Sequence, residues 1–252
     1  MATTLLSVED HAGVRTITID RPEAKNALDR SMRAELCDLL ASADADARIR
    51  AVILTGADPV FTAGVDFKDF EPGFDPAKAQ FTVNPGRVLR ALRTPVICAV
   101  NGACVSGGLE IALSATFAVA SERARFADTH GRLNAVPTWG LTALLPRAVG
   151  LRKAREMSMT GNFVDAHEAH RIGLVNHVVA HEELLGFTHQ LAEDIADAPA
   201  VTEILALYDR GADLGLNAAL ALETAYTTTR KGFDPRDFEE AGRAASRRQR
   251  KP

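Results

Sequence analysis

The stretch Asn101-Gly102-Ala103-Cys104-Val105-Ser106-Gly107-Gly108-Leu109-Glu110 says more about the fold than any other part of the chain. It follows the apolar run 95–100, which predicts a buried strand, and it leads into the apolar run 111–113, which predicts a helix. Gly107 and Gly108 leave room for a ligand to approach the backbone. The stretch therefore predicts a strand-to-helix turn with open backbone N–H groups.

A second loop of the same kind lies about forty residues earlier, at Phe61-Thr62-Ala63-Gly64-Val65-Asp66-Phe67-Lys68. It follows the apolar run 51–54, which Thr55-Gly56 ends, and its last residues could begin a helix. Free N–H groups at a helix start can point at one anion. Neither loop has the spacing GxGxxG or GxxxxGK[ST], so the sequence predicts no nucleotide-binding loop of those two kinds.

The residues before these loops predict a hairpin and a helix. Residues 3–8 and 14–20 have the alternation of strands, with His11-Ala12-Gly13 as the turn between them. Asp29 or Ser31 can cap a helix that ends near Asp46. Its apolar face carries Met32, Leu36, Leu39 and Leu40.

Strands and helices alternate along the following chain, so the fold class is α/β. Strands are expected at 116–120, 124–127 and 174–179, helices at 141–149 and 151–159, and a long loop with one weak helical turn at 73–86. From about Glu182 only helical signals remain, at 184–196, 201–226 and 237–248. We therefore expect a core over residues 1–195 and a carboxy-terminal helical segment over residues 196–252, which would serve oligomerisation.

Composition excludes several classes of function. The formal net charge of -4 offers no basic excess for a nucleic-acid backbone. The amino terminus lacks a targeting pattern and no long apolar span follows, so we expect a cytoplasmic protein outside the membrane. The three cysteines have no metal-binding spacing, and His167 and His170 lie three apart without the HExxH pattern. We expect no metal site, with these two histidines on the surface.

Together, the two glycine-bearing loops resemble the crotonase (enoyl-CoA hydratase/isomerase) family, which places FxAGxD and NGxxxGGGxE after successive buried strands. Further likeness lies in Arg21-Pro22-Glu23-Ala24-Lys25-Asn26-Ala27-Leu28, in Leu145-Pro146-Arg147-Ala148-Val149-Gly150 and in the terminal Arg250-Lys251-Pro252. The resemblance implies a spiral of ββα units with two roughly perpendicular sheets. It also implies an acyl-CoA thioester substrate, no separate cofactor, and assembly as a homotrimer or a dimer of trimers.

The resemblance assigns an oxyanion hole and a CoA path. The N–H groups of Val65 and Gly107 would bind the thioester carbonyl oxygen, where negative charge develops during reaction. The matching CoA and substrate positions are Ala24, Lys25, Ala63, Asp66, Phe67, Lys68 and Gly108. For Lys25 and Lys68, a solvated surface lysine is an equally good interpretation.

Glu110 matches the first catalytic glutamate of the hydratases, which positions and deprotonates water. The alternative is an acidic residue that only stabilises a helix start. His130 stands where hydratases carry their second glutamate. It could complete an acid/base pair with Glu110, or it could only pack or hydrogen-bond beside the acyl pocket. Asp128 is a weaker candidate for the second carboxylate, since two residues along would change its direction on a strand.

These residues favour hydration of a 2-trans-enoyl-CoA to a 3-hydroxyacyl-CoA, a reaction of fatty-acid β-oxidation. Isomerisation is the second hypothesis, and thioester hydrolysis, decarboxylation or dehalogenation would use the same oxyanion hole. A family member that binds acyl-CoA without turnover is the non-enzymatic alternative. Trp139 could shape the acyl pocket or pack in the core, and Ser106 lacks the GxSxG context of a nucleophile.

Overall fold

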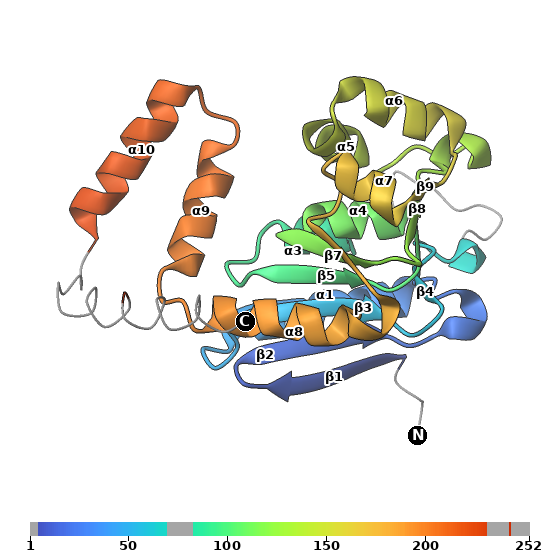
Figure 1. The fold of residues 1–252 in the computed structure, drawn as a ribbon, viewed down its shortest axis with the longest axis horizontal. Coiled ribbons are helices and arrows are strands. Elements are labelled where there is room, and N and C mark those ends of the chain that lie inside the picture. Colours follow the sequence, from blue (N-terminus) through green and yellow to red (C-terminus); the bar gives the residue numbers. More distant parts are fainter. Residues whose placement is uncertain (1–4, 70–82, 231–241, 243–252) are drawn as a thin grey trace. The chain divides into compact units, whose positions relative to one another are not determined.

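The computed structural model describes residues 5–69, 83–230 and 242, and the chain divides into two compact units, residues 1–202 and 203–252. A six-stranded sheet forms the centre of the first unit (Figure 1). Its strands, in spatial order, are β1 (Leu6–His11), β2 (Val14–Ile19), β3 (Ala51–Gly56), β5 (Val96–Val100), β7 (Phe117–Ser121) and β10 (His177–Val179). β1 and β2 pair antiparallel, and the other neighbours pair parallel.

The predicted hairpin is confirmed, but its first strand continues to His11 instead of ending at Val8. His11 pairs with Val14, which leaves only Ala12 and Gly13 in the turn. Both have positive φ, 49° and 78°. A two-residue hairpin turn of this kind matches the right-handed twist of the strands, so pairing takes up the residue that sequence assigned to the turn.

A second, four-stranded sheet was not predicted strand by strand. Its strands, in spatial order, are β4 (Val60–Thr62), β6 (Ala103–Val105), β8 (Arg125–Ala127) and β9 (Val164–Asp165). Only β8 matches an expected strand. The other three contain two or three residues each, too few for an alternating pattern to be recognised. β4 and β6 pair in parallel and lead directly into the two glycine-bearing loops.

Helices cover both faces of the large sheet. Helix α1 (Arg30–Ala45) begins at Asp29, whose carboxylate accepts a hydrogen bond from the Met32 amide at 2.9 Å, as the capping signal predicts. Alternate side chains of β2, β3 and β5 pack toward α1 or toward α8 (Leu184–Ala196), which gives two apolar clusters. The other α-helices in the described part of this unit are α3 (Pro85–Leu89), α4 (Gly107–Ser114), α5 (Leu141–Val149), α6 (Leu151–Thr160) and α7 (Ala166–Arg171).

The expected strand 174–179 is shortened to β10 because its first residues close helix α7. The amides of Leu174 and Val175 donate to the carbonyl of Ala169, and Gly173 supplies the positive φ of 79° that this helix end requires. Most of the expected loop 73–86 lies outside the described residues, and its last two residues belong to α3.

The single helix expected over 201–226 is wrong. The structure has two helices, α9 (Val201–Gly211) and α10 (Leu216–Thr229), separated by a turn. Gly215 has extended backbone angles and precedes α10, which interrupts the helical path. The helix expected over 237–248 falls outside the described residues except at residue 242, and the terminal tripeptide falls outside them entirely. Among the helices that are described, none has the length and apolar character needed to span a bilayer.

Candidate active site

The two glycine-bearing loops lie against each other at the ends of β4 and β6. Gly64 has a φ of 90°, and a methyl group on its α-carbon would lie 2.7 Å from the backbone nitrogen of Gly107. Leu28 holds the first loop from the other side, because its amide donates to Gly64 O and its carbonyl accepts from Asp66 N. Glycine at position 64 is therefore required for both the backbone angle and the contact between loops.

The backbone nitrogens of Val65 and Gly107 lie in the same small region. A methyl group on the Gly107 α-carbon would lie 3.3 Å from Val65 N. Gly107 is the first residue of α4, so its N–H has no partner within the helix. Within residues 5–69 and 83–230, no acceptor is paired with either amide. Two adjacent, unpaired N–H donors are the arrangement that an oxyanion hole requires.

Glu110 projects from the first turn of α4 into the protein and is 2% exposed. Its Oε1 accepts hydrogen bonds from the amides of Trp139, at 2.6 Å, and Leu141, at 3.3 Å, where α5 begins. Burial raises the pKa of the Glu110 carboxyl, and these two hydrogen bonds offset only part of that rise. A buried carboxyl with a raised pKa is suited to proton transfer near neutral pH.

His130 lies between Glu110 and Asp128. Its Nε2 is 3.9 Å from Glu110 Oε2, and its Nδ1 is 2.6 Å from Asp128 Oδ1. The structure thus brings together the acid/base pair that the sequence proposes. Asp128 turns toward the histidine, an arrangement that sequence reasoning missed. The expected change of direction at Asp128 was wrong, because β8 ends at Ala127 and the chain turns after it, so that Asp128 Oδ1 contacts His130 Nδ1.

Comparison with known proteins decides the family. The model of the enoyl-CoA hydratase/isomerase family matches residues 9–245. The chain belongs to this family. It is 36% identical over 217 residues to an Arabidopsis thaliana protein named probable enoyl-CoA hydratase 1, peroxisomal, covering 85% of this chain and 82% of that protein. It is 33% identical over 245 residues to the 1,2-epoxyphenylacetyl-CoA isomerase of Escherichia coli, covering 94% and 90%.

Solved structures of enoyl-CoA hydratases share the fold. The Mycobacterium tuberculosis enzyme is 44% identical, with a TM-score of 0.75, and covers 88% of this chain and 96% of its own. The Geobacillus kaustophilus structure is 30% identical, with a TM-score of 0.87 and coverage of 99% and 97%. The expected crotonase fold, with two mixed sheets and carboxy-terminal helices, is confirmed.

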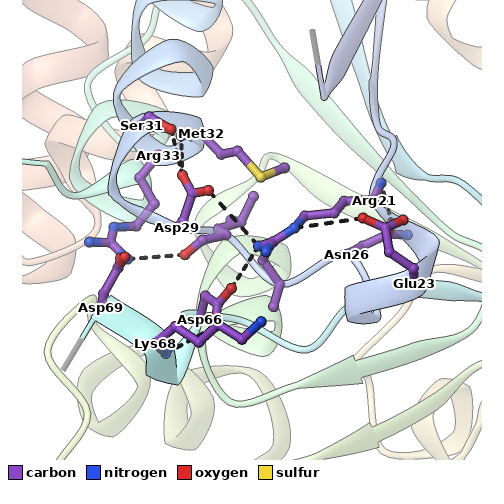
Figure 2. Close-up of polar contacts among 12 residues, drawn as sticks. Arg21, Glu23, Asn26, Asp29, Ser31, Met32, Arg33, Asp66, Lys68 and Asp69 are labelled. Atoms are coloured by element: carbon purple, nitrogen blue, oxygen red, sulfur yellow. Dashed lines mark hydrogen bonds and ion pairs between the residues drawn. The ribbon is translucent and has the colours of Figure 1, made fainter. Parts of the chain in front are cut away.

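In this family member, a polar network anchors the first loop (Figure 2). Arg21 Nη1 donates to Asp66 Oδ2 at 2.7 Å and to the carbonyl of Ala27 at 3.1 Å. Asp66 Oδ1 accepts from the backbone nitrogen of Lys68, and Arg33 binds Asp69 Oδ2 at 2.9 Å. The hydrogen bond from the Lys68 amide lowers the pKa of the Asp66 carboxyl. Partial burial opposes this effect and the Arg21 guanidinium adds to it, so the carboxyl is ionised at neutral pH.

The predicted CoA positions lie on two adjacent segments. The Ala63 amide donates to the carbonyl of Lys25 at 3.1 Å, which places residues 24–25 beside residues 63–68. Lys25 and Lys68 are exposed, and Phe67 is 61% exposed. The Asp66 carboxylate, in contrast, is already satisfied by protein donors. Contact of this segment with CoA stays a prediction.

Trp139 is 5% exposed and joins the main apolar cluster, yet it also borders the second glycine-bearing loop at Gly107. A methyl group on Gly107 would lie 3.1 Å from Trp139 Cζ3. Gly108 has a different neighbour: a methyl group there would lie 2.4 Å from the carbonyl oxygen of Thr62, so packing against β4 alone explains this glycine. Its contact with substrate stays a prediction.

Ser106 and the histidines of α7 lie outside the proposed chemistry. Ser106 Oγ lies 2.7 Å from Thr129 Oγ1 and accepts a hydrogen bond from the Thr129 amide, which connects the second glycine-bearing loop to the segment that carries His130. His167 and His170 are exposed on α7, as expected. Among the described residues, no cluster of histidine, cysteine and carboxylate side chains is suited to a metal ion.

Proposed function

We propose that the chain hydrates 2-trans-enoyl-CoA thioesters to 3-hydroxyacyl-CoA. The observation that carries this proposal is the meeting of Glu110 Oε2 and His130 Nε2, 3.9 Å apart, next to the loops that bear the unpaired amides of Val65 and Gly107. An enoyl thioester needs both features: donors for its carbonyl oxygen and a pair of groups that move protons. Relatives named enoyl-CoA hydratase support this choice within the family.

In the proposed reaction, Glu110 removes a proton from water and the oxygen of that water forms a bond to the β-carbon. Electron density moves through the α-carbon to the thioester oxygen, where the amides of Val65 and Gly107 stabilise the enolate. Protonated His130 then gives the α-carbon a proton through Nε2. Transfer of a proton from Glu110 to His130 restores the starting state, so the net change is addition of one water across the double bond.

We propose further that the CoA portion follows Ala24, Lys25, Ala63, Phe67 and Lys68, along the exposed side of the two adjacent segments. Its phosphates would pair with the exposed lysines. This assignment uses the family resemblance together with the contact between Ala63 and Lys25.

The test is hydration of crotonyl-CoA and longer 2-enoyl-CoA thioesters, followed by chromatographic separation of the 3-hydroxyacyl products. We expect wild-type turnover, and we expect Glu110→Gln to abolish it while CoA binding, measured by calorimetry, stays within a few-fold of wild type. Glu156→Gln, an exposed glutamate on α6, is the matched control. If wild type hydrates none of the panel, the hydratase assignment is wrong.

His130→Glu separates the two interpretations of His130. If His130 is the acid, as proposed, the substitution lowers the rate of hydration, since Asp128 would face a second carboxylate in place of an imidazole. A higher rate would mean that the dyad is incomplete in wild type. An unchanged rate would make His130 structural.

Isomerisation of an acyl-CoA is the second candidate function. The specific observation in its favour is the Escherichia coli relative, which is named an isomerase and aligns over nearly the whole chain. A reaction of this kind can use one group that takes a proton and returns it elsewhere. Conversion of 3-enoyl-CoA or epoxyacyl-CoA substrates without hydration would favour it, whereas acyl-CoA binding without any product would favour the non-catalytic alternative.

A further inference from the structure

We propose that Asp128 is a positioning residue, which holds the proton of His130 on Nδ1 and turns Nε2 toward Glu110. The 2.6 Å contact joins His130 Nδ1 to Asp128 Oδ1, and the backbone amide of His130 donates to the same oxygen at 3.1 Å. An ionised carboxylate can only accept hydrogen bonds, so Nδ1 must be the donor. His130 then has Nε2 for exchange with Glu110 or substrate.

The surroundings of Asp128 favour the ionised form. Burial alone would raise its pKa, but hydrogen bonds from His130 and from Ser158 outweigh burial and hold the pKa of Asp128 below its ordinary value. Asp128 is 1% exposed, so water does not replace these donors. Within the described part of the chain, the charged groups paired with His130 are Asp128, just after β8, and Glu110 on α4, and Glu110 in turn interacts electrostatically with Arg90.

The segment that carries both residues is fixed to the second glycine-bearing loop, which holds the proposed oxyanion donor Gly107. Thr129 lies between Asp128 and His130, and its amide and hydroxyl both bind Ser106 Oγ. Ser106 directly precedes Gly107, whose amide is a proposed donor to the thioester oxygen. The position of the imidazole is therefore fixed relative to the place where the carbonyl would bind, and a proton donor needs such a fixed position relative to its substrate.

A carboxylate in this position has two effects on a histidine. It selects the tautomer, and it stabilises the imidazolium that exists before the proton moves to the α-carbon. Removing the negative charge while keeping the shape should therefore damage proton transfer more than substrate binding. This inference uses the hydratase proposal for its kinetic test, but its spectroscopic test is independent of that proposal.

The spectroscopic test is ¹⁵N NMR of histidine-labelled protein at a pH where His130 is neutral. We expect the proton on Nδ1 in wild type, with a downfield ¹H resonance for the Nδ1–H group because its hydrogen bond is short. In Asp128→Asn the amide group can donate to Nδ1, so the Nε2-protonated tautomer should gain population. A wild-type signal that places the proton on Nε2 overturns the inference. This measurement uses only the wild-type protein without substrate, so it does not depend on whether a variant folds.

The kinetic test is a double-mutant cycle. Asp128→Asn should lower kcat for hydration about 100-fold or more with KM near wild type, the range expected for general acid catalysis. In the His130→Gln background the same change should cost less than two-fold, because Asp128 acts through His130. Asp38→Asn, an exposed aspartate on α1, should change nothing. Equal losses in both backgrounds would make Asp128 merely structural, whereas inactive wild type with the expected NMR signal would reject only the hydratase proposal.

Discussion

At the scale of single residues, the absence of a side chain at position 107 is central to the proposed site. A methyl group there would approach Gly64 Cα, Trp139 Cζ3 and Val65 N within 3.1–3.3 Å. Each of these contacts is tighter than ordinary packing allows, so the Val65 amide or the indole would have to move. Because the oxyanion donors must be placed to within a fraction of an ångström, a small shift is costly to turnover.

Gly107→Ala is therefore expected to lower kcat for enoyl-CoA hydration by about 10²-fold, comparable to loss of one oxyanion donor. Overpacking should lower the free energy of unfolding by about 1–3 kcal/mol, measured by urea denaturation. The matched control is Gly186→Ala in α8, where the added methyl group meets no atom within 4 Å. Full activity of the Gly107→Ala protein would show that the two amides do not share a substrate oxygen.

The pH dependence of stability tests the environment of Glu110. Its pKa is raised in the folded protein mainly by burial, so the folded state binds more protons than the unfolded state between the two pKa values. This contribution to stability is fully present below pH 4.5, the ordinary value, and is lost as pH rises through the folded pKa.

Glu110→Gln removes that titration. We expect the free energy of unfolding of the variant, minus that of wild type, to be larger at pH 8 than at pH 4. Parallel thermal and urea denaturation at the two pH values would measure it. The difference should grow as pH rises. A difference that instead shrinks with rising pH would mean that the Trp139 and Leu141 amides stabilise the carboxylate more than burial destabilises it.

At the scale of elements, the Arg21 side chain connects the first glycine-bearing loop to the residues at the start of helix α1. Its guanidinium forms an ion pair with Asp66, just before the turn 67–69, and donates a hydrogen bond to Ala27 O. The same Nη1 lies 3.9 Å from Oδ2 of Asp29, the cap of α1. Both Arg21 and Asp66 side chains are largely buried, at 15% and 11% exposure. Loss of the cation would leave the Asp66 carboxylate with one remaining donor, the Lys68 amide.

Arg21→Ala should lower the free energy of unfolding by about 2–4 kcal/mol, because breaking a buried pair leaves an uncompensated charge. It should also raise KM for acyl-CoA, since Asp66 adjoins Val65, a proposed oxyanion donor. Arg30→Ala, on the exposed face of α1, is the control and should cost less than about 0.5 kcal/mol. A stability of Arg21→Ala within that same range would show that the network of Figure 2 has little energetic weight.

The sequence predicted elements best where a long pattern had a clear end. Helix α1 has Asp29 as its cap, and α5 and α8 have the predicted bounds, because apolar spacing over several turns is hard to mistake. The short strands β4, β6 and β9 were missed, since two or three residues acquire strand geometry only from pairing with neighbours. The break before Gly215 was missed because residues on both sides of it favour a helix.

In the candidate site, too, some features were predicted from the sequence and others were missed. The order of the two loops in sequence, with the family resemblance, was enough to place Val65, Gly107 and Glu110 near one another. The contact of Asp128 with His130 depends on how the chain turns after β8. Thr129 holds that turn, because its amide and hydroxyl bind Ser106 Oγ on the second glycine-bearing loop. Long-range contacts of this kind leave no periodic signal in the sequence.

At the scale of the whole molecule, the carboxy-terminal helices present apolar side chains to solvent. A cavity of about 480 Å³ between α9 and α10 is lined by residues such as Ile204, Leu207, Tyr208, Leu216 and Leu220. Tyr208 and Leu216 are each 75% exposed. Exposed apolar surface of this extent is typical of a protein interface, and we propose that it serves the homotrimer or dimer of trimers expected from the family resemblance.

The double substitution Leu216→Glu and Leu220→Glu should dissociate such an assembly, because each added carboxylate would be buried at the interface without a partner. Light scattering coupled to size-exclusion chromatography would report the molar mass. Met159→Glu, at an 80% exposed position on α6, is the control and should leave the mass unchanged. A wild-type protein that is monomeric at micromolar concentration would contradict the proposed assembly.

The most direct test of the central claim is a crystal structure of the protein with butyryl-CoA, a saturated thioester that cannot be hydrated. We predict that the thioester oxygen lies about 2.7–3.1 Å from both Val65 N and Gly107 N, the distance expected for oxyanion-hole donors. The β-carbon should lie within reach of Glu110, with His130 Nε2 facing the α-carbon. A thioester bound elsewhere, or held by only one of these amides, would contradict the proposed function.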